Sequence, residues 1–107
     1  MTAAVRPTQE QLADLVNRHI DAGDVRQGLA TCQRLNRDYP AHAYGWYLAS
    51  FLMKRARNFP DALRAIDRAI ELSCSDRYLL HKAKCLFESG DITGAIAAAA
   101  TLRDKSF

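Results

Sequence analysis

Three stretches of this sequence repeat one pattern: Gly23–Gly28 (GDVRQG), Arg57–Ala62 (RNFPDA) and Gly90–Ala95 (GDITGA). Their starting positions give a nearly constant period of about 34 residues, the length typical of stacked helical hairpins. Such a period repeats one supersecondary unit that cannot bury its apolar face alone. The sequence therefore predicts an all-α chain built from three such units.

Apolar residues recur at helical spacing on both sides of each turn, which predicts six helices. We expect them over residues 9–22, between Asp24 and Tyr39, over 43–57, between Asn58 and Ser73, over 76–89 and over 92–104. Asp24, Asn58 and Ser75 carry side chains that cap a following helix. The connections have only a few residues, so neighbouring helices should run antiparallel.

The composition sets limits on function. A chain of 107 residues with 49% apolar residues makes one domain, and its net charge of +3 comes from scattered basic residues. A nucleic-acid interface would gather them on one face, and a membrane span would need an apolar run of about 18 residues. We expect neither. Cys32, Cys74 and Cys85 lack metal-site spacing, so we expect reduced thiols in a cytoplasmic protein without metal or cofactor.

The second unit carries the most informative set of residues, reading Trp46, Ala49, Ser50, Met53, Asn58, Phe59, Ala62, Ile66 and Ala69. This pattern resembles the tetratricopeptide repeat (TPR) family. The resemblance implies a right-handed superhelical stack of three antiparallel helix-turn-helix hairpins. The repeats would cover residues 9–42, 43–75 and 76–107, after a flexible N-terminus at 1–7.

The same resemblance assigns residues to the packing between helices. Trp46 is expected in the core. Small residues are expected to meet where the two helices of a hairpin approach closely, at Ser50 with Ala62 and at Ala83 with Ala95. In the first repeat Val16 is larger than the family pattern, and Gly28 opposite it would make room.

TPR stacks usually bind peptides in a concave groove lined by the first helix of each hairpin. The register predicts a peptide- or protein-binding groove that contains Asn17, Tyr44, Tyr47, Leu48, Phe51, Arg55, Arg77, Leu80, His81, Lys84 and Phe87. Outward aromatic residues of this kind mark an interaction site. A segment of the parent protein or another copy of the chain is the alternative cover for them.

Two more specific functions, binding of chaperone tails and catalysis, are not supported by the groove residues. The carboxylate clamp of chaperone-binding TPR domains needs five polar or basic side chains, and Ala13, Leu48 and His81 occupy three of those positions. His81 has no nucleophile or carboxylate partner that the sequence identifies, so we expect an ordinary polar groove residue and no enzyme.

We therefore predict a protein–protein interaction module. The alternatives are a regulatory or oligomerisation arm of a larger enzyme, such as a TPR-fused transferase, and a small secretion-type chaperone. The last helix is rich in alanine, including Ala97 to Ala100, which lets another helix approach closely. It is expected to contact a second copy or another part of a longer parent protein.

Overall fold

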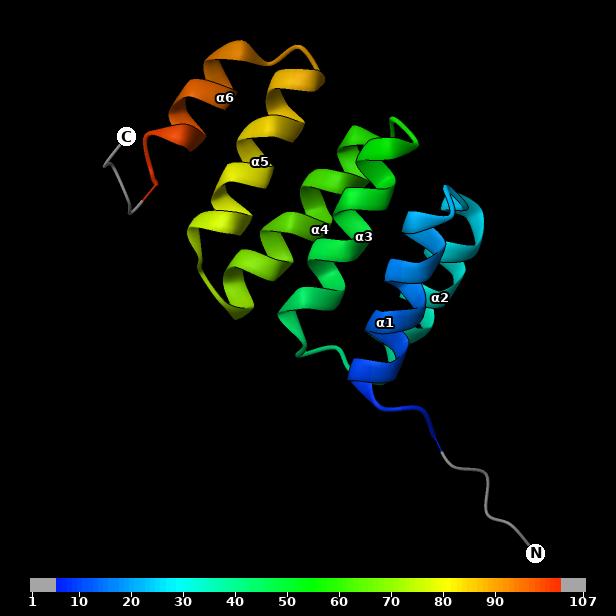
Figure 1. The fold of residues 1–107 in the computed structure, drawn as a ribbon. Coiled ribbons are helices and arrows are strands. Elements are labelled where there is room, and N and C mark those ends of the chain that lie inside the picture. The colour runs from blue at the N-terminus through cyan, green and yellow to red at the C-terminus, as the bar shows by residue number, and fades with distance from the viewer. Residues whose placement is uncertain (1–5, 103–107) are drawn as a thin grey trace, which may run out of the picture.

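Six α-helices form the fold, and the computed structural model describes residues 6–102 (Figure 1). In chain order they are α1 (Gln9–Asp21), α2 (Val25–Asp38), α3 (Ala43–Arg55), α4 (Phe59–Leu72), α5 (Asp76–Glu88) and α6 (Ile92–Ala99). No strand occurs within residues 6–102. The predicted all-α class and the order of the helices are confirmed. The expected flexible N-terminus and the end of the third repeat lie largely outside the described range.

The three hairpins close through one kind of turn. In each, the backbone amide of the residue that caps the second helix donates to the carbonyl five positions earlier, at 2.8 Å from Asp24, 2.8 Å from Asn58 and 2.9 Å from Asp91. The side chains of these residues then accept a hydrogen bond from the backbone amide three positions later. A Schellman ending is thus followed directly by an N-cap, which accounts for the repeated sequence pattern.

The residue before each cap adopts a left-handed conformation. Gly23 has φ 73° and Gly90 has φ 95°, whereas the second turn places Arg57 there with φ 62°. A side chain with a Cβ is strained in this region. The Arg57 guanidinium lies 5.1 Å from the ring centroid of Phe59, so this turn gains a cation–π contact that the glycine turns lack.

The hairpins stack along the long axis of a molecule that measures 57 × 25 × 23 Å. The first helices α1, α3 and α5 lie in one row (Figure 1). Val16, Leu35, Leu52 and Ile66 are the largest fully buried aliphatic side chains, so the core runs through the interfaces between helices. The predicted close approach within the second hairpin is confirmed, because Ser50 Oγ donates to the carbonyl of Ala62 at 2.7 Å.

Two packing predictions need correction. The side chain nearest to Gly28 is not Val16, since a Cβ on Gly28 would lie 3.1 Å from both methyl groups of Leu52 on α3 of the next hairpin. Trp46 is half-buried against the core, not enclosed by it, and its Nε1 donates to the carbonyl of Pro40 at 2.8 Å. The indole packs against two groups of buried residues, one containing Leu35 and Leu52 and the other containing Ile66 and Ala69.

The last helix is shorter than expected. α6 ends at Ala99, and the Thr101 hydroxyl donates to the carbonyl of Ala98 at 2.6 Å. The Leu102 amide donates to the carbonyl of Ala99, three residues earlier, which is a tight turn and not a continuing α-helix. Within residues 6–102, no helix combines the length and apolar content that crossing a bilayer requires.

Candidate functional site

The row formed by α1, α3 and α5 carries a pocket of about 190 Å³, here called the α1–α3–α5 pocket. Its walls come from all three hairpins and consist of Asn17, Ile20, Tyr44, Tyr47, Leu48, Phe51 and Arg77. Six of these seven residues belong to the predicted groove, so residues far apart in the sequence do converge. Ile20 of α1 is the one lining residue that the sequence did not assign to the groove.

Stacked tyrosines form one side of the pocket. The ring centroids of Tyr44 and Tyr47 are 5.8 Å apart at an interplanar angle of 22°, and those of Tyr47 and Tyr78 are 5.3 Å apart at 29°. Asn17 Nδ2 donates to the Tyr44 hydroxyl at 3.2 Å, which ties α1 to α3. These contacts hold the rings in place before any ligand binds, which lowers the entropy cost of binding.

Arg77 brings a positive charge to the tyrosines from α5. Its guanidinium lies 5.4 Å from the ring centroid of Tyr44 and 4.8 Å from that of Tyr47. Hydrogen bonding to Tyr47 raises the pKa of Arg77, so the side chain stays charged. A second exposed cation, Arg55, lies 5.7 Å from the ring centroid of Phe51. The pocket therefore combines an apolar interior with a basic edge.

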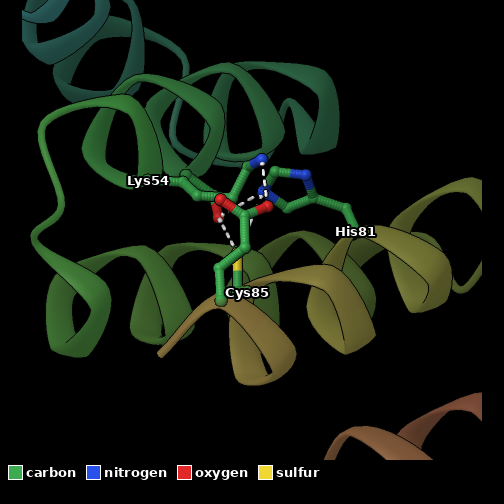
Figure 2. A network of polar contacts seen from close by, with 5 residues as sticks. Lys54, His81 and Cys85 are labelled. Atoms are coloured by element: carbon green, nitrogen blue, oxygen red, sulfur yellow. Dashed lines mark hydrogen bonds and ion pairs between the residues drawn. The ribbon is translucent and has the colours of Figure 1, made fainter. Parts of the chain in front are cut away.

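His81 does not occupy the groove as predicted, because it lies beneath this surface and is only 6% exposed. Its Nε2 is 2.9 Å from Ser50 Oγ on α3 and 3.4 Å from Cys85 Sγ on its own helix (Figure 2). The Tyr47 ring covers it edge-on, with centroids 5.1 Å apart. Burial, with the charges of Lys54 and Lys84 nearby, lowers the pKa of His81 to about 4.

The hydrogen bonds around His81 assign its proton. Ser50 has one hydroxyl proton, which it donates to the carbonyl of Ala62, so its oxygen accepts from His81 Nε2–H. The Cys85 side chain is fully buried, and that burial raises the pKa of its thiol. A neutral, inaccessible thiol is a poor nucleophile. Ser50, His81 and Cys85 therefore form a polar connection between α3 and α5 rather than a catalytic group.

An ion pair also joins α3 to α5 beside this connection. Lys54 Nζ lies 2.9 Å from Glu88 Oε2 (Figure 2). The sequence did not identify Ser50, Cys85 or this ion pair as neighbours of His81. Only the spacing of His81 and Cys85, four residues apart on one helix, could have indicated part of the group. Within residues 6–102, no three His, Cys, Asp or Glu side chains gather as metal ligands would.

The remaining predicted groove residues have different positions. Leu48 is 3% exposed and forms the floor of the pocket as part of the core, not an outward contact. Leu80 is exposed on α5 and is not part of the pocket. Lys84 and Phe87 border a second pocket between α5 and α6. Six of the predicted groove residues thus line the α1–α3–α5 pocket, and Lys84 and Phe87 border the pocket between α5 and α6.

Comparison with known proteins gives similarity of structure only. No protein-family model matches the sequence, and none of the curated proteins matches it. The type III secretion translocator chaperone SycD of Yersinia enterocolitica superposes with a TM-score of 0.82 at 16% identity. That match covers 91% of this chain and 74% of SycD, in a crystal structure described as an alternative dimer.

Two further structures have the same arrangement. SycD in complex with a peptide of the translocator YopD gives a TM-score of 0.81 at 16% identity, covering 91% of this chain and 75% of SycD. The O-GlcNAc transferase of Thermobaculum terrenum gives 0.82 at 23% identity, covering 96% of this chain and 21% of the transferase. Identities this low show the fold alone. The chain has the fold of a TPR-like stack of helical hairpins.

Proposed function

We propose that this chain is a TPR interaction module that binds a peptide or protein segment at the α1–α3–α5 pocket and has no catalytic role of its own. The convergence of all three hairpins on one preformed pocket carries this proposal. Its volume of about 190 Å³ is smaller than the roughly 300–1,000 Å³ typical of small-molecule sites. A space of this size suits one apolar side chain of a longer ligand.

The charges around the pocket favour an acidic residue next to that apolar anchor. Arg77 and Arg55 are exposed, and each guanidinium lies over an aromatic ring at the pocket. Guanidinium groups bind carboxylates through charge-assisted hydrogen bonds. The neutral His81 adds no charge to the site. The ligand we expect carries an aliphatic or aromatic residue flanked by Asp or Glu.

A small secretion-type chaperone is the second candidate. The likeness to SycD favours it, since one SycD structure holds a translocator peptide. A regulatory arm of a larger enzyme is the third, because this chain covers only 21% of the matched transferase. Either role would use the same pocket, and the free thiols of Cys32 and Cys85 agree with a reducing, cytoplasmic setting.

Selection from a random peptide library against the whole chain tests the proposal. We expect enriched peptides to bind the wild type and a Leu15→Ala variant equally, because Leu15 is an exposed leucine on α1 outside the pocket. A Tyr47→Ala/Phe51→Ala variant of unchanged helicity should bind them at least about tenfold more weakly, as expected for interface aromatics. Equal binding by the double variant would reject the pocket as the site.

A further inference from the structure

A second apolar surface lies at the α6 end of the stack, away from the α1–α3–α5 pocket. Phe87, Ile92 and Ile96 are 62%, 49% and 67% exposed, and they line a pocket of about 500 Å³ together with Ala83, Ala95 and Ala99. We call these six residues the end face. Solvent-exposed apolar side chains gathered around one pocket mark an interaction surface.

The same groove is filled in the other two hairpins. Leu52 of α3 packs onto Gly28 in the first hairpin, and His81 of α5 bonds to Ser50 in the second. Ala83 is the third-hairpin equivalent of Ser50, one repeat further along the chain. Within residues 6–102 no helix packs over Ala83 from beyond α6. The end face therefore has the form of an inter-hairpin interface with one half missing.

The opposite end of the stack does not fit this groove. The surface of α1 that would enter it carries Asp14 and Arg18, which precede the buried Leu48 and Leu52 by one repeat. Both charged residues border the exposed pocket at that end, with Arg34 beside them. Head-to-tail stacking of two copies would bury these charges against alanines, which is costly. An open filament is thus disfavoured.

We propose that two copies of this chain associate through their end faces about a two-fold axis. A two-fold interface requires a self-complementary surface. The end face meets this requirement, since Lys84 and Glu88 of opposite charge lie on consecutive turns of α5 at its border. Under two-fold symmetry Lys84 of each copy faces Glu88 of the other, whose carboxylate also binds Lys54 of its own chain through Oε2. The segment Ile92–Ala99 contains no charged residue, and its alanines allow close approach.

Sedimentation velocity over a concentration series tests the association. We expect the wild type to sediment at twice the chain mass of 12.0 kDa as concentration rises. Ile96→Glu should remain a monomer, because it places a charge on the end face. Leu15→Glu is the matched control at the other end and should associate like the wild type. A wild type that sediments as a single chain at every concentration would overturn the proposal.

Charge exchange tests the two-fold arrangement itself. K84E and E88K should each weaken self-association, because either change places like charges opposite each other in a dimer of the variant; E88K also removes the Lys54–Glu88 ion pair within the chain. An equimolar mixture of the two variants pairs acid with base at both contacts, so we expect dimerisation to recover. Circular dichroism of each variant checks that the helices are intact. A mixture no more dimeric than the separate variants would contradict the two-fold contact.

Discussion

His81 Nε2 lies 2.9 Å from Ser50 Oγ and joins the third hairpin to the second beneath the tyrosines of the α1–α3–α5 pocket. The Ser50 oxygen accepts from the imidazole and its proton bonds to the carbonyl of Ala62, so one hydroxyl links three helices. This connection sets the position of α5, and with it Arg77, relative to α3. The shape of the proposed binding site depends on it.

Stability should therefore fall in mild acid. His81 has a pKa of about 4 in the folded chain against an ordinary value of 6.5, so the unfolded chain takes up the proton first. Neutral His81 makes its full contribution to the free energy of unfolding above pH 6.5. As the pH falls from 6.5 to 4, the free energy of unfolding decreases by about 1.4 kcal/mol per pH unit, or about 3 kcal/mol in all. Urea unfolding of the wild type and of His81→Gln from pH 7.5 to 4 measures it. Identical profiles for the two proteins would show that His81 does not titrate as proposed.

Ser50→Ala should lower the free energy of unfolding by about 1–3 kcal/mol, because it removes two buried hydrogen bonds and leaves the His81 imidazole N–H with only the Cys85 sulfur as a partner. Ser89→Ala is the matched control, since Ser89 Oγ also donates to a backbone carbonyl but is exposed. We expect the control to cost under about 0.5 kcal/mol. Thermal denaturation of both variants makes the comparison. Equal costs would mean that the buried connection contributes no more than a surface hydrogen bond.

Arg57→Gly should stabilise the chain. The arginine has φ 62° where the other two turns use glycine, and relieving this conformation is worth about 1–2 kcal/mol. The loss of the contact with Phe59 and the added freedom of the unfolded chain each reduce the gain by about 0.5 kcal/mol, so the net stabilisation we expect is at most about 1 kcal/mol. Chemical denaturation gives the difference. A destabilised variant would show that the contact with Phe59 and the unfolded chain together outweigh the strain.

Arg77→Gln should weaken binding of an acidic peptide about tenfold or more, because a charge-assisted hydrogen bond contributes roughly 1.5–3 kcal/mol. Arg64→Gln on α4 is the control, as Arg64 is exposed and pairs with Asp61 away from the pocket. Titration calorimetry at two salt concentrations should also show that added salt weakens wild-type binding more than that of Arg77→Gln. An equal loss in both arginine variants would mean that only the overall charge matters.

The turns and helices could be predicted from the sequence because each is determined by neighbouring residues. Asp24, Asn58 and Asp91 bond within three residues of themselves, and the Ser50–Ala62 contact follows from one hairpin alone. Such local interactions are encoded in short segments.

The burial of Leu48 and His81 depends on packing between hairpins, which the local pattern does not contain. The two residues hold the same place in successive repeats, at the contact with the preceding hairpin. Asp14 holds that place in the first repeat and is exposed, because within residues 6–102 no hairpin precedes it. The sequence register alone predicts that this repeat position faces the groove. The rotation of each hairpin against the one before it decides which side chains reach the surface.

The ligand position on the folded chain is the most direct test of the central claim. Amide chemical shifts of the whole chain, recorded while a library-selected peptide is added, locate the contact residue by residue. We predict the largest changes at Asn17, Tyr44, Tyr47, Phe51 and Arg77, from three helices that meet at one pocket. Changes concentrated on α2 and α4, with these five residues unaffected, would contradict the account.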